Sequence, residues 1–195
     1  MSGSDAIAII ELTSIARGFT ALDTMIKRAP VRVLDSGVIS PGKFLIVVTG
    51  DVASVDEAFI AGLAHGDDRV IDRLFLPQVH RQIVPVMDGA AALPPIDAVG
   101  IVEAWSAAST IHAADVAAKC AAVDLLTIKF SRHLGGKGYF TLTGPQEDVE
   151  AALGAASEVL TAAGLLVACE QINRPHEEFI EEILPRGGSE LRWRS

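Results

Sequence analysis

The feature that most constrains this chain is an internal repeat. The stretch from residue 5 to residue 36 returns from residue 97 to residue 128, a shift of 92 residues, and the two copies match at 12 of 32 positions. The matches include charged residues, such as Glu11 with Glu103 and Lys27 with Lys119. Because a biased composition does not place charges in register, the repeat indicates a duplicated domain whose two copies fill equivalent places in a symmetric assembly.

The repeat divides the 195 residues into two small domains of ordinary size. We predict a first domain at 1–86, a linker at 87–96, a second domain at 97–186 and a disordered polar tail at 187–195. Half of the residues are hydrophobic, and the mean hydropathy is +0.37. For domains this short, we interpret that composition as apolar surface buried between subunits.

Composition also argues against several classes of partner. The net charge of −9 lacks the basic footprint of a nucleic-acid-binding protein. No basic segment precedes the first apolar run, and no apolar run approaches the ~20 residues of a membrane span, so we expect neither a secretory signal nor a membrane partner. Cys120 and Cys169 are isolated in apolar contexts, which predicts two buried, inert thiols.

Each copy is predicted to contain strand, helix, strand, strand, helix and strand, in that order. In the first copy these elements are expected at 6–12, 15–29, 31–38, 44–49, 52–65 and 70–76. In the second copy they are expected at 98–104, 106–121, 123–130, 139–143, 146–163 and 165–172. Such a unit makes an antiparallel sheet with two helices on one face, so the predicted fold class is α+β with two tandem ferredoxin-like (βαββαβ) domains.

The first helix has a clear start, one apolar face and a clear end. Ser14 is a candidate N-cap, and Pro30 stops the helix because the residue before proline avoids the α region. Apolar residues recur between these two limits at helical spacing, at Ile15, Phe19, Leu22 and Ile26. The opposite face of each sheet must meet solvent, a partner or an added segment.

The chemistry-bearing residues do not form a recognisable reaction centre. None of the five histidines stands in HExxH or another metal-ligand spacing. The sequences around Lys43 and Lys137 are glycine-rich but lie between two strands, whereas a phosphate loop must open a helix. We therefore predict no catalytic residue, no metal site and no cofactor. The pairs Asp23/Lys27 and Asp115/Lys119 would form ion pairs at i, i+4 spacing, at the same register in both copies.

A series of short motifs occurs in the same order in both copies. The first strand ends in Ile10-Glu11 in one copy and in Val102-Glu103 in the other, and the later turns carry Gly42-Lys43 and Gly136-Lys137. The second copy ends in the letters NRPH at 173–176. With these motifs, residues 5–184 resemble tandem copies of the shell domain of bacterial microcompartments.

That resemblance implies a non-enzymatic structural shell protein of the tandem, unpermuted type. Three such chains would form a homotrimer, a pseudohexamer with the outline of a hexagonal tile, in a microcompartment shell in the bacterial cytoplasm. The implied partners are other shell proteins, both hexamers and pentamers, with encapsulated enzymes as further candidates.

The resemblance also implies positions for a central pore and for the tile edge. The turn between the two middle strands of each domain would approach the axis and line a pore for small polar metabolites: Ile39, Ser40, Pro41, Gly42, Arg132, His133, Leu134 and Gly135. The edge, where neighbouring tiles meet, would carry Lys27, Lys119 and Arg174. Some tandem shell proteins hold an iron–sulfur cluster through a cysteine just before the PGKF motif. Serine is a poor ligand for such a cluster, so Ser40 predicts that none is bound.

Two other functions stay open on the residues alone. A pair of ferredoxin-like domains can serve as a regulatory small-molecule-binding module, which would require a ligand pocket. An enzyme of the same fold could use His133 or His112, although neither has a nucleophile beside it in sequence. Sheet-forming particles would favour the shell protein, whereas a ligand-dependent thermal shift would favour the regulatory module.

Overall fold

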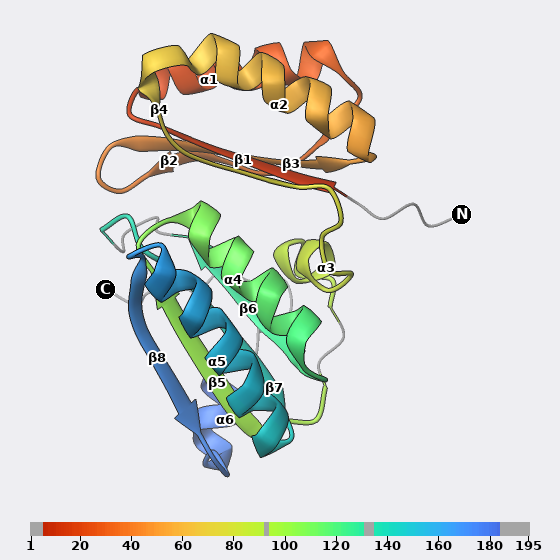
Figure 1. Ribbon diagram of the computed structural model, residues 1–195, viewed down its shortest axis with the longest axis vertical. Helices are drawn as coiled ribbons and strands as arrows, with labels where there is room; N and C mark the ends of the chain where they lie inside the picture. Colours follow the sequence, from red (N-terminus) through yellow and green to blue (C-terminus); the bar gives the residue numbers. More distant parts are fainter. Residues whose placement is uncertain (1–5, 92–93, 131–134, 184–195) are drawn as a thin grey trace.

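The fold is described by a computed structural model, which covers residues 6–91, 94–130 and 135–183. Each half of the chain forms a four-stranded antiparallel sheet with two long helices on one face (Figure 1). The strand orders are β2-β3-β1-β4 and β6-β7-β5-β8, which is the ferredoxin-like order in both cases. The predicted α+β class with two tandem domains is confirmed.

The elements of the first domain follow the predicted sequence closely. They are β1 (Ala6–Leu12), α1 (Ile15–Arg28), β2 (Arg32–Ile39), β3 (Lys43–Gly50), α2 (Val52–Gly66), a short 3₁₀ turn (Asp67–Arg69) and β4 (Val70–Leu76). The side chain of Ser14 accepts from Arg17 N and that of Asp51 from Ser54 N, so both helices begin at side-chain caps.

The second domain repeats this plan. Its elements are β5 (Ala98–Ala104), α4 (Ala107–Cys120), β6 (Asp124–Phe130), β7 (Gly138–Gly144), α5 (Gln146–Ala162), β8 (Leu166–Ile172) and a terminal α6 (Glu177–Ile183). Even a buried side-chain contact recurs, because Thr49 Oγ1 donates to Ala6 O and Thr143 Oγ1 donates to Ala98 O. The two halves therefore share this side-chain contact as well as the order of their elements.

The two domains stack so that α4 covers the face of the first sheet that α1 and α2 leave open (Figure 1). All seven residues of β1 are buried for this reason. Ala6, Ala8, Ile10 and Leu12 face α1 and α2, whereas Ile7 and Ile9 join one continuous core with the second domain. We call this contact between the first sheet, α4 and the connecting segment the interdomain seam.

Three of the four residues of the predicted apolar face of α1 are exposed, whereas the fourth, Leu22, is half-buried and packs against the core of the first domain. The residues of α1 buried against the first sheet are Gly18, Ala21 and Met25. Ile15, Phe19 and Ile26 are exposed, and Phe19 keeps 60% of its surface accessible. Helical periodicity identified an apolar stripe correctly but could not say which surface the stripe meets.

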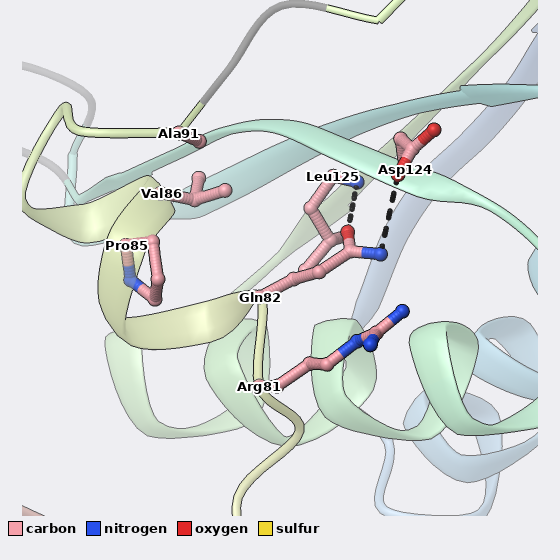
Figure 2. Close-up of a pocket in the computed structure, with 7 residues that line it drawn as sticks. All are labelled: Arg81, Gln82, Pro85, Val86, Ala91, Asp124 and Leu125. Atoms are coloured by element: carbon pink, nitrogen blue, oxygen red, sulfur yellow. Dashed lines mark hydrogen bonds between the residues drawn. The ribbon is translucent and has the colours of Figure 1, made fainter.

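The connection between the domains contains a helix that the sequence did not predict, α3 (Ile83–Met87), which packs against the edge strand β6. The Gln82 side chain completes that edge, as its Nε2 donates to Val123 O at 3.0 Å and its Oε1 accepts from Leu125 N at 2.7 Å. Figure 2 shows the Gln82 side chain reaching from the start of α3 to β6, where its Nε2 also lies 3.4 Å from Asp124 Oδ1. A side-chain amide thus pairs an edge that would otherwise be open.

Two further expectations concern the surface. Cys120 is exposed and Cys169 is half-buried, so the prediction of two buried thiols is wrong for Cys120. Cys120 is the last residue of α4, and its thiol lies 3.8 Å from Ala151 O of α5, a surface position that its apolar sequence context did not reveal. Among the described residues, no helix has both the length and the apolar character needed to cross a membrane.

Candidate pore turns and the interdomain seam

The structure brings the two predicted pore turns next to each other. A Cβ placed on Gly136 would lie 3.4 Å from Ser40 O and 3.8 Å from Lys43 Nζ, although these residues are almost a hundred positions apart. Gly136 has φ of +94°, and its lack of a side chain allows the close approach of the first turn. The β2–β3 and β6–β7 connections thus meet at one end of the seam.

The individual pore candidates differ in exposure. Pro41 and Gly42 are exposed and Ser40 is half-buried, whereas the side chain of Ile39 packs in the core of the seam. Gly135 is exposed and has φ of +65°. Arg132, His133 and Leu134 lie outside the described residues. Whether any of these residues lines a pore stays a prediction.

Glu11 lies in the seam against the start of α4, and its side chain is fully buried. Its Oε1 accepts hydrogen bonds from Ala107 N at 2.8 Å and from Ala108 N at 3.4 Å. These are the first two residues of α4, whose N–H groups have no acceptor within the helix. The carboxylate of one domain therefore caps a helix of the other, where the helix dipole also favours negative charge.

The charge of Glu11 is only partly compensated. Its Oε2 lies 3.5 Å from Lys43 Nζ and accepts no hydrogen bond among the described residues. Burial raises the pKa of Glu11 above its ordinary value of 4.5, against the lowering effects of Lys43 and the two backbone donors. The motif shared by both copies, a glutamate one residue before the end of the first strand and a lysine at or just before the start of the third, is thus an ion pair.

The second copy of this ion pair has a different environment. Glu103 pairs with Lys137, as Glu11 does with Lys43, but about a third of the Glu103 side chain is exposed. The Lys137 ammonium also lies 5.9 Å from the ring centre of the exposed Trp105. Among the described residues, no helix begins next to the Glu103 carboxylate. Glu103 is therefore in the situation that Glu11 would have if α4 were absent.

The two aspartate–lysine pairs also differ between the domains. Asp115 is buried, accepts from His80 N at 2.6 Å and pairs with Lys119 at 2.6 Å. Lys119 Nζ donates in addition to Gln78 O at 2.6 Å, so this pair ties α4 to the connecting segment. Asp23 and Lys27 form the same 2.6 Å ion pair on α1, but both side chains are largely exposed.

The described residues contain no cluster of histidine, cysteine, aspartate or glutamate able to hold a metal ion. A shallow groove follows the seam between β4 and α4, where Asp72, Arg73 and His112 lie beside apolar residues of α5. A second shallow pocket lies between α3 and β6, and Arg81 and Asp124 are among its lining residues (Figure 2). His133, one of the two histidines considered for catalysis, lies outside the described residues.

Comparison with known proteins identifies the family. A family model described as the BMC domain matches residues 6–79 and 98–175, one range in each half of the chain. The chain belongs to the BMC-domain family. It is 42% identical over 181 residues to the bacterial microcompartment shell protein PduT of Citrobacter freundii, across 93% of this chain and 98% of PduT. A shorter match, 37% identical over 71 residues, relates one BMC domain to the shell protein EutK of Escherichia coli K12.

Solved structures agree with this assignment. A crystal structure of a microcompartments protein from Desulfitobacterium hafniense DCB superposes with a TM-score of 0.87 at 38% identity, over 92% of this chain and 99% of that one. A fused permuted shell protein gives a TM-score of 0.58 at 22% identity, which shows the fold alone. The resemblance found in the short sequence motifs is confirmed, and the two BMC domains follow one another in the tandem order.

Proposed function

We propose that this protein is a structural, non-catalytic component of a bacterial microcompartment shell, which it tiles as a homotrimer of pseudohexameric outline. The observation that carries the proposal is the match of both halves to the BMC domain, together with a shell-protein relative that aligns over nearly the whole chain. Two equivalent domains in each chain supply six equivalent positions in a trimer, the number that a hexagonal outline requires.

We propose further that the adjacent turns at the end of the seam surround a central opening. The contact between Gly136 and the Ser40 carbonyl supports this arrangement, since it joins both turns of a chain at one place. The hydroxyl of Ser40 would offer hydrogen bonds without fixed charge, which suits the passage of small polar metabolites. Other shell proteins and the enclosed enzymes would be the partners of the assembled tile.

The proposal is tested on the purified full chain by light scattering and electron microscopy. We expect a particle with three times the mass of the chain at micromolar concentration, and flat sheets or shells at higher concentration. A stable monomer or dimer that never forms sheets would contradict the shell assignment. A thermal shift on addition of nucleotides or amino acids, without sheets, would favour the regulatory module.

The predicted edge lysines provide a test of contacts between tiles. Replacing Lys27 and Lys119 together by alanine should abolish sheets while the trimer persists. Loss of the exposed Lys27–Asp23 pair should cost about 1 kcal/mol or less. Lys119→Ala removes the cationic partner of the buried Asp115 and should cost more, so circular dichroism must show that the double variant is folded. Alanine is preferred to aspartate because a carboxylate at position 119 would stand near the buried Asp115 carboxylate and the Gln78 carbonyl oxygen. Arg69→Ala, an exposed cation on the 3₁₀ turn, is the control. Normal sheets from the double variant would refute the edge assignment.

The proposed axial position of Ser40 can be tested by replacing Ser40 with a residue that binds metals. In the trimer, Ser40→Cys would bring three thiolates together, and thiolates bind iron–sulfur clusters or soft metals. We expect anaerobic reconstitution with iron and sulfide to give a coloured protein with its metal bound per trimer. Ser54→Cys, on α2, should stay colourless. A colourless Ser40→Cys trimer would show that Ser40 does not converge on the axis.

A further inference from the structure

We infer that the pocket between α3 and β6 binds a small zwitterion, of the class of free α-amino acids with an apolar side chain. We call it the α3–β6 pocket, and its lining residues are Arg81, Gln82, Pro85, Val86, Ala91, Asp124 and Leu125. Its volume of about 260 Å³ is close to the lower end of the range for small-molecule sites. The inference goes beyond the proposed shell function and does not depend on it.

Contacts at both ends of α3 hold the walls of the pocket in place. At the start of the helix, the Gln82 side chain is hydrogen-bonded to the backbone of β6. At its end, Asp88 Oδ1 accepts from Arg32 Nη1 of β2 at 2.9 Å, which ties the helix to the first domain. Ile83 and Val84 of the helix are buried. Because α3 cannot move away from β6 without breaking these contacts, the pocket is formed before a ligand arrives.

Two opposite charges in the pocket are not paired with each other. The Arg81 guanidinium makes no hydrogen bond or ion pair with a described residue, and it extends in the same direction as the Gln82 side chain (Figure 2). Asp124 Oδ1 accepts one long hydrogen bond, at 3.4 Å from Gln82 Nε2, and Oδ2 accepts none among the described residues. A ligand that carries both a carboxylate and an ammonium group would pair with both charges.

The Gln82 amide lines the pocket but has no hydrogen-bonding capacity left for a ligand of this size. Its Oε1 accepts from Leu125 N, and its Nε2 donates to Val123 O and Asp124 Oδ1. Both amide hydrogens are therefore in use. The polar recognition in this pocket is left to Arg81 and Asp124, which favours a ligand with two opposite charges over a neutral alcohol or sugar.

The remaining lining is apolar and selects the side chain of the ligand. Pro85 and Val86 lie on α3, and Ala91 follows in the connecting segment; all three are half-buried (Figure 2). Leu125 of β6 is buried. An aliphatic side chain would remove these surfaces from water, whereas an inorganic ion or glycine would leave them hydrated. The lining therefore indicates an amino acid with an aliphatic side chain.

Such a ligand would join two parts of the chain. Its carboxylate would contact Arg81 in the connecting segment, and its ammonium group would contact Asp124 at the start of β6. Because the ligand bridges the connection and the second domain only in the folded protein, its binding should raise the unfolding temperature.

Four small molecules separate the parts of the inferred ligand, and isothermal calorimetry on the purified full chain measures their binding. L-Leucine has all three parts and should bind with a dissociation constant of about 1 mM. Isocaproate lacks the ammonium group, isoamylamine lacks the carboxylate and glycine lacks the side chain. Each of these three should bind about tenfold more weakly than leucine, because one group of the pocket is left without its partner.

Two substitutions assign the charged contacts. Arg81→Gln should weaken leucine binding about tenfold and should bind leucine and isoamylamine equally, since the carboxylate has lost its partner. Asp124→Asn should instead bind leucine and isocaproate equally. Arg73→Gln and Asp56→Asn are the controls, because both residues are exposed and lie outside this pocket, and their leucine binding should match the wild type. Circular dichroism shows that each variant is folded.

The measurements can overturn the inference without affecting the shell function. Leucine that binds the wild type no more tightly than isocaproate and isoamylamine, or equally well after Arg81→Gln and Asp124→Asn, would overturn the zwitterion site. Sheets formed by a chain that does not bind leucine would leave the shell function intact. Leucine binding by a chain that never forms sheets would support the pocket and contradict the shell function.

Discussion

Glu11→Ala is expected to lower the free energy of unfolding by about 2–3 kcal/mol, because it removes the buried group that joins the two domains. The substitution leaves the first N–H groups of α4 without their acceptor and deprives Lys43 of its partner. Lys43 is about a quarter exposed and can turn towards solvent, which keeps the loss below the upper range for a broken buried pair.

Denaturant unfolding at one fixed chain concentration measures this change, since assembly adds to the apparent stability. Glu57→Ala is the matched control, because Glu57 forms an exposed ion pair with Arg28 and its loss should change the free energy by less than ~1 kcal/mol. Equal effects of the two substitutions would show that Glu11 does not stabilise the seam.

The pH dependence of Glu11→Gln gives an independent check of the same site. Burial raises the pKa of Glu11 in the folded state, so the folded protein binds this proton more tightly than the unfolded chain does. The stability of the wild type relative to Glu11→Gln should therefore be highest below the ordinary pKa of 4.5 and fall as the pH rises through the raised value. The glutamine keeps an oxygen acceptor for α4 and does not titrate. A difference between the two proteins that is flat in pH would contradict the raised pKa.

Gly18→Thr is expected to destabilise the first domain by about 3 kcal/mol or more, because its new side chain would occupy the space of Phe44. A Cβ at Gly18 would lie 2.3 Å from Phe44 Cγ, and the Phe44 side chain is buried in the core. In the second domain the same two positions are filled the other way round, with the side chain on the helix and the glycine on the strand. Thr110 stands on its helix at the position of Gly18, and Gly138 stands on its strand at the position of Phe44.

The exchanged pair can be transplanted as a double-mutant cycle. Phe44→Gly alone should cost about 3–5 kcal/mol by leaving a cavity. Together, Gly18→Thr and Phe44→Gly should cost at least ~2 kcal/mol less than the sum of the single changes. Thermal unfolding of all four proteins measures the coupling. Gly154→Ala, on the exposed side of α5 with open space at its Cβ, should be neutral or stabilising. Strict additivity would refute the size exchange.

These two sites explain how one domain plan can occupy two different surroundings. The seam requires small residues on α4, such as Ala107 and Ala114, so that the helix can approach the first sheet closely. The equivalent positions of α1, Ile15 and Leu22, are larger: Ile15 is exposed, and Leu22 is half-buried and packs against the core of the first domain. The two copies have therefore diverged in size and charge while keeping the glutamate, aspartate and lysine of the shared plan.

The sequence by itself determined the duplication, the strand and helix order and the α+β fold. Its period-two and helical patterns depend on neighbours a few residues away, so β1, β4 and β5 begin and end where they were expected. The resemblance to microcompartment shell domains also followed from local motifs in a repeated order. These features are fixed by short-range spacing and need no knowledge of what packs across the molecule.

Only the tertiary structure decided which surfaces meet. The stripe of α1 that carries Phe19 and the stripe of α4 that carries Ile111 have the same helical spacing, yet one is exposed and the other is buried. Burial depends on a sheet almost a hundred residues away, and a local pattern contains no information about that distance. The same reason hid the cap that Glu11 gives to α4, the pairing of β6 by Gln82 and the meeting of Gly136 with Ser40. In each of these contacts, the two groups come together only because the two domains stack as they do.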